Sequence, residues 1–285
     1  MSRKLMHARG ELSLDRCLVM GIVNRTPDSF YDGGRMDLDA SVAYARTLAE
    51  QGADVLDLGA VKAGPGDPVP EDEEMRRLLP LVEALGGDLP LSIETARPRV
   101  AAAAIEAGAT IVNDVSGLLD PRLADVCAAG GAGLVLMHNG GQIRGRPRHP
   151  YYEDVVGSIA RWWEGTAARA VEAGVSPASI VVDPGLDFGM TTFHSLEVMR
   201  RLEELTSGPY PVLVAPSNKD VVGETLGLGI DERLEGTLAL VALAVRARAS
   251  MVRVHDVRAT VRTVRMVEAV GGNRRPKDPV RGLWD

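Results

Sequence analysis

Short apolar runs alternate with polar turns and longer amphipathic stretches along most of the chain. Each run is rich in Leu, Ile and Val and is too short for a helix, which is typical of strands buried on both faces of a parallel sheet. Such runs lie at residues 18–23, 55–58, 91–93, 110–115, 133–137, 180–182, 212–215 and 251–254.

The stretches that follow these runs are rich in Ala, Leu, Glu and Arg, which favours helices. They lie at residues 38–51, 71–85, 97–107, 121–129, 155–173, 194–205, 231–248 and 257–270. Gly52, Gly108 and Gly174 follow three of them, as glycines that end helices do. Repeated strand–helix units predict an α/β fold, a closed (β/α)₈ TIM barrel, with an open doubly wound sheet as the alternative.

No linker or change in composition divides the 285 residues. We therefore expect one TIM-barrel domain over residues 1–285, with the barrel at about 17–270. Residues 271–285 are rich in Pro, Arg and Gly and are expected to form a loose C-terminal tail.

Composition excludes several classes of function. The formal charge of −7 and the pI of about 5.4 argue against nonspecific nucleic-acid binding. Cys17 and Cys127 are the only cysteines, too few for a disulfide framework or a zinc ligand set. No segment approaches the ~20 consecutive apolar residues that span a bilayer. We expect a cytoplasmic protein whose partners are small molecules, without nucleic-acid or membrane binding.

Nearly every apolar run ends at polar or charged residues. Because the C-terminal ends of barrel strands meet at one mouth, where catalytic residues gather, we expect these side chains to surround one site. For any one of them alone, local capping or solvation is an equal alternative. They are Asn24, Asp57 with Gly59, Glu94, Asn113 with Asp114, His138, Asp183, Ser217 with Lys219, and Arg253 with His255.

The chemistry of these side chains suits a polar heterocycle. Glu94, Asn113 and Asp183 offer acceptors and an amide to a flat ring that carries N–H and NH₂ donors. Lys219 can place a positive charge near a ring carbonyl.

The first and last strands are neighbours in a closed barrel and carry a different chemistry. Arg253 and His255 suit a phosphate, and the Asn24 amide oxygen suits a hard divalent metal. Together the two groups predict a site for a heterocycle that bears a phosphoryl leaving group.

Several collinear motifs over about residues 17–270 resemble the dihydropteroate synthase family. They are Met-Gly-Ile-Val-Asn-Arg-Thr-Pro-Asp-Ser-Phe at 20–30, Asn-Asp-Val-Ser-Gly at 113–117, Leu-Met-His at 136–138, Asp-Pro-Gly with Phe-Gly at 183–189, and Arg-Val-His-Asp-Val at 253–257. The resemblance implies a TIM barrel, usually a homodimer. It also implies an enzyme that uses Mg²⁺ to join a dihydropterin hydroxymethyl diphosphate to p-aminobenzoate and releases pyrophosphate.

The resemblance also implies roles for individual residues. Asn24 is expected at the Mg²⁺ site, and the pterin is expected to leave its diphosphate as a cation before the amine attacks. Asp183 would stabilise the electron-poor ring, while Arg253, His255 and Mg²⁺ would stabilise the leaving group. The expected substrate-binding residues are Glu94, Asn113, Asp183, Lys219, Arg253, Ser217 and Phe188, and the expected catalytic residues are Asp183, Lys219, Arg253 and His255.

The chain departs from the family pattern mainly on the acceptor side. Where the family reads Gly-Gly-Glu-Ser-Thr-Arg-Pro-Gly after the second strand, residues 59–66 read Gly-Ala-Val-Lys-Ala-Gly-Pro-Gly. Losing one donor to a developing charge can cost ~3 kcal/mol, or 10²–10³ in rate. The departures are Ala63 for Thr, Gly64 for Arg, Asn218 for Arg, Glu94 for Asp, Asp187 for Gly, Met190 for Lys, and Arg25 for a small apolar residue; Arg25 and Lys62 could restore positive charge from new positions.

Three functions remain open. The first is a synthase-type transferase with a weak or different amine acceptor, and the second is a catalytically inactive paralogue that only binds a pterin. The third, a pterin-dependent methyltransferase, is disfavoured by the Thr-Pro-Asp-Ser-Phe loop at 26–30. The Ala/Val/Leu-rich segment 237–247 exceeds what one barrel face needs and is expected to support a homodimer.

Overall fold

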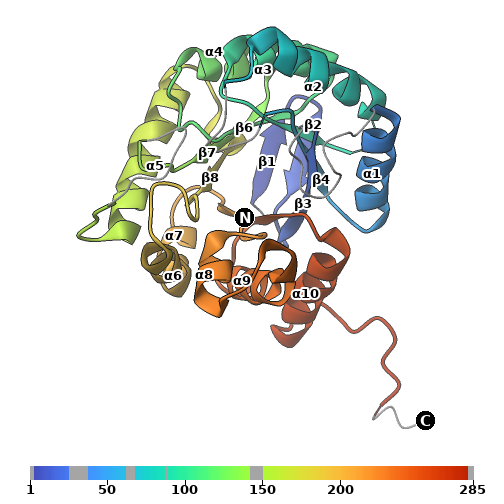
Figure 1. The fold of residues 1–285 in the computed structure, drawn as a ribbon, viewed down its shortest axis with the longest axis vertical. Helices are drawn as coiled ribbons and strands as arrows, with labels where there is room; N and C mark the ends of the chain where they lie inside the picture. Colours follow the sequence, from blue (N-terminus) through green and yellow to red (C-terminus); the bar gives the residue numbers. More distant parts are fainter. Residues whose placement is uncertain (1–2, 26–37, 62–67, 88, 142–149, 282–285) are drawn as a thin grey trace.

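The computed structural model describes residues 3–25, 38–61, 68–87, 89–141 and 150–281. The Thr-Pro-Asp-Ser-Phe motif at 26–30 and Lys62, Ala63 and Gly64 lie outside these residues. A parallel sheet forms the centre of the molecule (Figure 1). Its strands are β3 (Leu18–Asn24), β4 (Val55–Gly59), β5 (Leu91–Glu94), β6 (Ile111–Asp114), β7 (Gly133–Met137), β8 (Ile180–Asp183), β9 (Leu213–Val214) and β10 (Met251–Val254).

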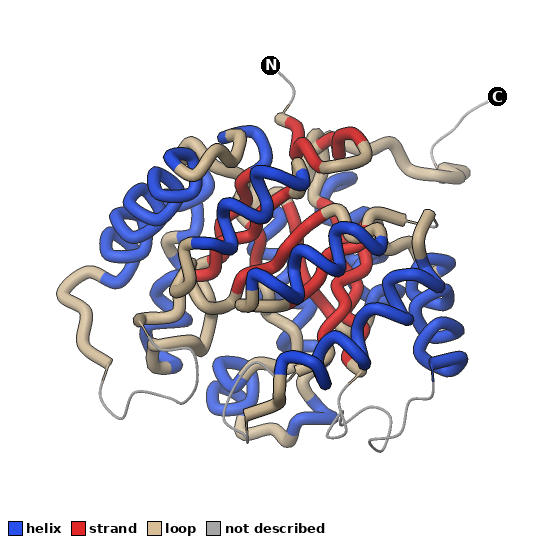
Figure 2. The backbone as a smooth tube through the Cα atoms, turned by 90° about the horizontal axis from the view of Figure 1, so that it is seen from above, coloured by secondary structure: helices blue, strands red, loops and turns tan. Residues whose placement is uncertain are grey.

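The sheet closes on itself. Its hydrogen-bonded order is β8-β7-β6-β5-β4-β3-β10-β9, and a parallel bridge between Val182 and Val212 joins the two ends. Helices surround the strands, which confirms the predicted (β/α)₈ TIM barrel and rules out the open sheet (Figure 2).

The helices largely follow the predicted ranges. They are α1 (Leu38–Glu50), α2 (Glu71–Leu85), α3 (Pro98–Ala107), α4 (Arg122–Gly130), α5 (Val155–Glu172), α6 (Thr192–Arg200), α7 (Leu202–Thr206), α8 (Asp220–Leu226), α9 (Leu234–Arg246) and α10 (Val257–Val270). The predicted helix at 194–205 is broken at Arg201 into α6 and α7, and α8 was not predicted. Within the described ranges, no helix has both the length and the apolar character to cross a membrane.

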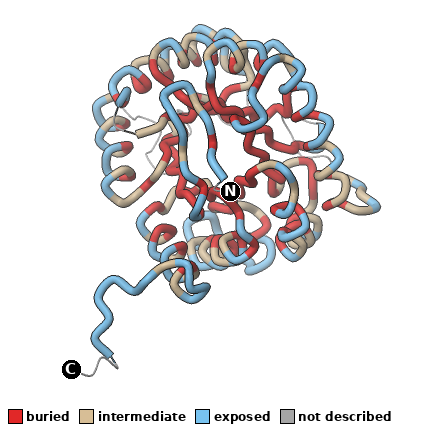
Figure 3. The backbone as a smooth tube through the Cα atoms, turned by 180° about the vertical axis from the view of Figure 1, so that it is seen from behind, coloured by how far each residue is buried: buried red, intermediate tan, exposed pale blue. Residues whose placement is uncertain are grey.

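An antiparallel hairpin precedes the barrel and was not predicted from the sequence. Its strands are β1 (Lys4–His7) and β2 (Gly10–Ser13), and most of its residues are exposed (Figure 3). Leu5 is fully buried and belongs to the apolar cluster of Leu14, Leu18, Met20, Val55, Ile111, Val135, Val181, Leu213, Ala215 and Met251. The hairpin therefore plugs the N-terminal end of the barrel.

The barrel interior changes from apolar to polar along the strands. Successive side chains of a strand point to opposite faces, so residues two apart share a face. Val55 and Met251 lie in the interior apolar cluster, and Asp57 and Arg253 follow them by two residues. The intervening Leu56 and Val252 belong to the larger core between strands and helices. This alternation places the polar side chains inside the C-terminal mouth of the barrel.

Candidate active site at the barrel mouth

A buried ion network joins side chains from the adjacent strands β4, β5 and β6 and from β10, which lies beyond β3 in the barrel. Arg253 Nε donates to Asp57 Oδ2 at 2.6 Å, and Arg253 Nη2 donates to Glu94 Oε2 at 2.6 Å. Asp57 also accepts from Ser92 Oγ at 2.5 Å and from Asn113 Nδ2 at 3.1 Å. The Asp57 side chain is fully buried, and the side chains of Glu94 and Arg253 are 8% and 15% exposed.

The network holds opposite charges together inside the protein. Burial raises the pKa of Glu94, and the positive charge of Arg253 partly offsets this effect. Burial acts to lower the pKa of Arg253, but Asp57 and Glu94 outweigh it and the net pKa is raised. Arg253 therefore stays charged, and each of its carboxylate partners compensates a charge that water does not reach freely.

The sequence placed Asp57 among the strand-end residues but assigned it no part in substrate binding or catalysis, yet Asp57 is the centre of the network. A signal was present, because Asp57 is an acidic residue within an otherwise apolar run of predicted strand. Its side chain points inward, in the layer above Val55, as the two-residue period of a strand requires. An ionised group inside a buried strand needs partners of opposite charge, and Arg253 supplies one.

Asp183 and Lys219 form a second part of the mouth. Asp183 Oδ1 accepts from the Gly185 N–H at 2.7 Å, and burial raises the pKa of Asp183 to about 6. Lys219 Nζ donates to the Leu186 carbonyl at 3.1 Å and lies 4.2 Å from the centroid of the Phe188 ring. Burial lowers the pKa of Lys219, and nearby carboxylates oppose this.

The turn after β8 requires its glycine. Gly185 has φ +67°, and a Cβ at this position would lie 1.8 Å from the carbonyl oxygen of His138. A larger residue would displace this turn, and with it both the Asp183 carboxylate and the Gly185 N–H that donates to it.

Ser217 and His255 connect the seventh and eighth barrel strands above the ion network. Ser217 Oγ lies 2.9 Å from His255 Nδ1 and accepts from the His255 backbone N–H at 3.2 Å. Burial lowers the pKa of His255 to about 4, and the charges of Arg253 and Lys219 act in the same direction. His255 is therefore neutral near pH 7 and offers a hydrogen bond, while Arg253 and Lys219 supply the positive charge.

Asn24 ends β3 beside Gly59 of β4, with which it is paired in register. A Cβ at Gly59 would lie 2.8 Å from Asn24 Oδ1, so the glycine leaves room for the amide. In the described part of the chain, no group of three or more His, Cys, Asp or Glu residues could hold a metal. The Asn24 amide oxygen is a hard donor of the kind that Mg²⁺ takes alongside water and substrate phosphate.

Arg25 could restore the positive charge that the second loop lost with Gly64, but its side chain points away from the site. Arg25 Nη1 donates to the Arg77 carbonyl of α2 at 2.6 Å, and Arg25 N donates to the Gly59 carbonyl. The guanidinium group is therefore bound to the helix layer.

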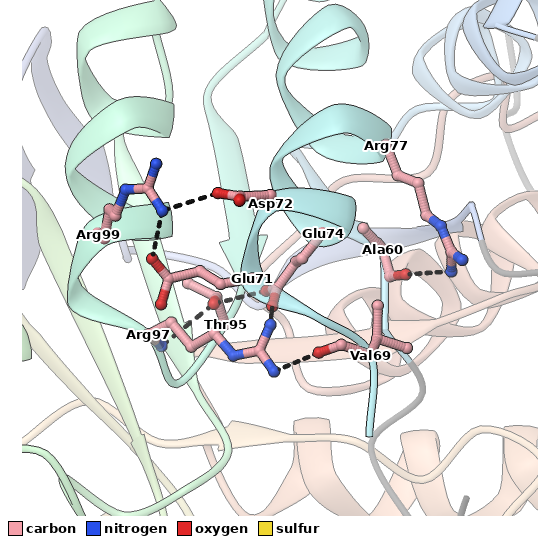
Figure 4. A network of polar contacts seen from close by, with 9 residues as sticks. All are labelled: Ala60, Val69, Glu71, Asp72, Glu74, Arg77, Thr95, Arg97 and Arg99. Atoms are coloured by element: carbon pink, nitrogen blue, oxygen red, sulfur yellow. Dashed lines mark hydrogen bonds and ion pairs between the residues drawn. The ribbon is translucent and has the colours of Figure 1, made fainter. Parts of the chain in front are cut away.

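A polar network between α2 and the residues after β5 fixes the end of that strand (Figure 4). Glu74 of α2 accepts from Thr95 Oγ1 and from Arg97 Nη1, both at 2.7 Å. Arg97 Nη2 donates to the Val69 carbonyl at 2.5 Å. Because Thr95 directly follows Glu94, this network positions the strand end that carries the Glu94 carboxylate.

The structure thus brings most of the predicted strand-end residues together at one end of the barrel. Asp114 instead accepts from the Ser116 and Leu118 N–H groups of the turn after β6, and the His138 ring lies against those of Tyr152 and Trp162. The ion network, Asp183, the Ser217–His255 pair and Asn24 stand at the carboxyl ends of their strands, and Lys219 follows β9 on the same side. A profile of the family described as pterin binding enzyme matches residues 20–255, which run from β3 to the residue after β10. The chain belongs to the pterin-binding enzyme family. The resemblance inferred from the motifs is confirmed.

Known members of the pterin-binding enzyme family are similar over nearly the whole chain. "Inactive dihydropteroate synthase 2" of Mycobacterium tuberculosis is 49% identical over 279 residues, which cover 94% of this chain and 87% of that protein. "Dihydropteroate synthase" of Bacillus subtilis is 40% identical over 261 residues, which cover 90% of this chain and 89% of that protein. The structure of Xanthomonas albilineans dihydropteroate synthase with 4-aminobenzoic acid matches with a TM-score of 0.88 and 39% identity, over 95% of this chain and 99% of that one.

Proposed function

We propose that this protein is a transferase of the dihydropteroate synthase type. It binds 6-hydroxymethyl-7,8-dihydropterin diphosphate and joins the pterin to an amine in folate biosynthesis, with p-aminobenzoate as a poor acceptor. The observation that carries the proposal is the convergence of Glu94, Asn113, Asp183 and Lys219 in one barrel mouth, with Arg253 beside them. The similarity to enzymes named dihydropteroate synthase supports it.

In this proposal the carbon–oxygen bond between the pterin methylene and the diphosphate breaks, and the electron pair leaves with pyrophosphate. The amine nitrogen then bonds to the methylene carbon and loses a proton. The Asp183 carboxylate stabilises the positive charge that develops on the ring, and His255 and Arg253 donate to the departing anion. Lys219 faces the ring carbonyl, while Ser217 and Phe188 help to shape the pocket.

Arg253 has to change partners for this role. Its guanidinium group binds the Glu94 carboxylate, which is also the expected acceptor for the pterin N–H donors. A pterin bound at Glu94 competes with Arg253 Nη2, so substrate binding would turn part of the guanidinium group toward the diphosphate. Asp57 holds the Nε side of the group meanwhile.

The proposal includes Mg²⁺ at the Asn24 amide oxygen. When bound, the ion would neutralise negative charge on the diphosphate.

A second candidate is a catalytically inactive protein that only binds a pterin. The 49% identity to a relative named inactive favours it, as do Ala63 and Gly64 in place of a hydroxyl and a guanidinium group. Both candidates use the same pterin pocket and differ only in turnover.

A pyrophosphate-release assay separates them. The substrate is dihydropterin diphosphate with Mg²⁺, with and without p-aminobenzoate or other arylamines. The transferase proposal expects amine-dependent release by the wild-type protein, slow with p-aminobenzoate. Pterin binding without release for any amine would establish the inactive binder instead.

Pterin binding is expected to weaken at acid pH. The carboxylates must be ionised to accept the ring N–H donors, and burial raises the pKa of Asp183 to about 6 and that of Glu94 in the same direction. Affinity should be constant from pH 7 to 8 and fall up to about tenfold per pH unit below pH 6. Calorimetric titration with 6-hydroxymethylpterin measures this, and circular dichroism checks that the protein stays folded. Constant affinity down to pH 5 would contradict the assignment.

We also propose a homodimer formed through α9 and α10. These helices pack side by side, and within segment 237–247 the side chain of Leu243 remains 50% exposed. Met266 and Val270 of α10 are 63% and 75% exposed. Together they give an apolar surface that a second copy could cover.

The variant Leu243→Glu should dissociate this dimer, because it would bury a charge in the interface. Leu119→Glu is the matched control, since Leu119 is 68% exposed and lies after β6, on a different part of the barrel. Light scattering should report dimers for the wild-type protein and the control and monomers for Leu243→Glu. A monomeric wild-type protein rejects the proposal.

A cytoplasmic location completes the proposal. Cys17 and Cys127 are buried free thiols, as expected in a reducing compartment. Burial raises the pKa of the Cys127 thiol to about 12, which makes it a poor nucleophile.

A further inference from the structure

Asp187 adopts a left-handed backbone conformation, which residues with a side chain rarely adopt. Its φ is +68°, in the loop between β8 and α6, at a position where the synthase pattern has glycine. A left-handed conformation is strained for residues with a Cβ, although less so for Asp and Asn than for the others. The contacts of the Asp187 carboxylate offset this strain.

The carboxylate caps a helix that lacks a cap of its own. Helix α8 begins at Asp220, and the preceding Lys219 has no acceptor to offer the first N–H groups. Asp187 Oδ2 accepts from the Asp220 N–H at 2.6 Å, and Asp187 Oδ1 accepts from the Val221 N–H at 3.2 Å. A negative charge at this end of the helix also interacts favourably with its dipole.

A buried serine holds Asp187 in this position. Ser195 of α6 is fully buried, donates through Oγ to Asp187 Oδ1 at 3.2 Å and accepts from the Asp187 N–H at 3.1 Å. Asp187 therefore ties α6 to the start of α8, and Lys219 is the residue at that start.

The Lys219 ammonium group contacts both neighbours of Asp187. Its Nζ donates to the Leu186 carbonyl at 3.1 Å and lies 4.2 Å from the centroid of the Phe188 ring. Burial lowers the pKa of Lys219. Among the charges that raise this pKa, Asp187 has the largest effect and Asp183 the next largest. The other charged groups that act on Lys219 are Arg253, which lowers its pKa, and Glu94, which raises it.

We propose that Asp187 is a positioning residue for Lys219. Its carboxylate fixes the start of α8 and places a negative charge beside the Lys219 ammonium group at the mouth of the pocket. The inference deepens the proposed function, on which it rests, because there Lys219 faces the pterin carbonyl. The aspartate in place of glycine thus ties the loop after β8 to the lysine-bearing loop after β9.

Competitive acetylation with acetic anhydride over a range of pH measures the titration of Lys219 directly. The chain has only four lysines, Lys4, Lys62, Lys219 and Lys277, so mass spectrometry can follow each one separately. Asp187→Asn removes the charge at nearly constant volume. Asp187→Gly also removes it and suits the left-handed backbone, so it provides a variant with relaxed geometry. Ser195→Ala is the matched control, because it removes a partner of Asp187 and keeps the charge.

Both Asp187 variants should lower the Lys219 titration midpoint by about one pH unit and leave exposed Lys277 unchanged. Ser195→Ala should shift Lys219 much less. An unchanged Lys219 midpoint in the Asp187 variants, or an equal shift in Ser195→Ala, would overturn the proposal. A wild-type protein that binds no pterin would refute the proposed function, but the Lys219 titration could still be measured. A failure of the proposed function is therefore distinguishable from a failure of the Asp187 proposal.

In a pterin-binding wild-type protein, affinity should decline at alkaline pH as Lys219 loses its proton. The Asp187→Asn variant should lose affinity at a pH about one unit lower than the wild-type protein. Coincident alkaline profiles of the two proteins would contradict the positioning role, since a merely structural defect lowers affinity without moving the midpoint.

Discussion

Replacing Asp57 with asparagine is expected to lower the free energy of unfolding by about 3 kcal/mol. Removing one partner of a buried ion pair leaves the other charge uncompensated, which typically costs about 3–5 kcal/mol. Asp57 is fully buried, its Oδ2 accepts from Arg253 and Asn113 and its Oδ1 accepts from Ser92, and an asparagine keeps only one of these two acceptor oxygens. Glu94 still pairs with Arg253, which places the expected loss at the lower end of the range.

Asp54→Asn is the matched control for this variant. Asp54 lies three residues earlier, just before β4, and pairs with Arg16, whose side chain is 45% exposed. The Asp54 side chain is 17% exposed and also accepts from the Val19 N–H, for which an asparagine keeps one acceptor oxygen. Because Arg16 can regain water when the pair is lost, this variant should lose only about 1 kcal/mol. Urea denaturation of the two variants and the wild-type protein measures the difference. Equal stabilities of the Asp57 and Asp54 variants would show that the mouth network is not a buried ion network in solution.

Restoring the family residues in the second loop is expected to raise p-aminobenzoate-dependent turnover by about 10²–10³-fold. The double variant Ala63→Thr/Gly64→Arg returns a hydroxyl and a guanidinium group to positions where the synthase pattern has them. Arg25 cannot substitute from its observed position, because its guanidinium group is bound to the Arg77 carbonyl. Pyrophosphate release at saturating dihydropterin diphosphate is the readout.

Ala60→Gly is the control for the double variant, since it also returns a family residue to this loop and adds no donor. Its turnover should equal that of the wild-type protein. If the wild-type protein already turned over p-aminobenzoate as fast as the Bacillus subtilis synthase, the reading of the second loop would be wrong. A double variant no faster than the wild-type protein would place the defect elsewhere in the site.

The barrel could be predicted because its strands have a strong and repeated signal. Strands buried on both faces are continuous apolar runs, and the runs at 18–23 and 133–137 coincide closely with β3 and β7. The hairpin β1–β2 gave no such signal, because only Leu5 among its eight residues is buried. Helix α8 was missed because seven residues with a central Gly223 are too short to show helical periodicity.

The membership of the site was predictable, while its internal contacts were not. Strand ends converge in any closed barrel, so the gathering of Glu94, Asn113 and Arg253 followed from topology. Which of them bind one another depends on side-chain length and register. The pairing of Arg253 with Asp57 and Glu94 needs β10, β4 and β5 in their observed alignment, and local sequence does not encode this.

The most direct test of the pterin pocket is a calorimetric titration of 6-hydroxymethylpterin into the wild-type protein, Asn113→Ala and Asp54→Asn. Asn113 lies in the mouth and Asp54 at the opposite end of β4. We predict saturable binding with a dissociation constant below about 1 mM for the wild-type protein and Asp54→Asn, and a loss of at least about tenfold for Asn113→Ala. No heat of binding by the wild-type protein at millimolar ligand, or equal affinity of all three proteins, would contradict a pterin site at the barrel mouth.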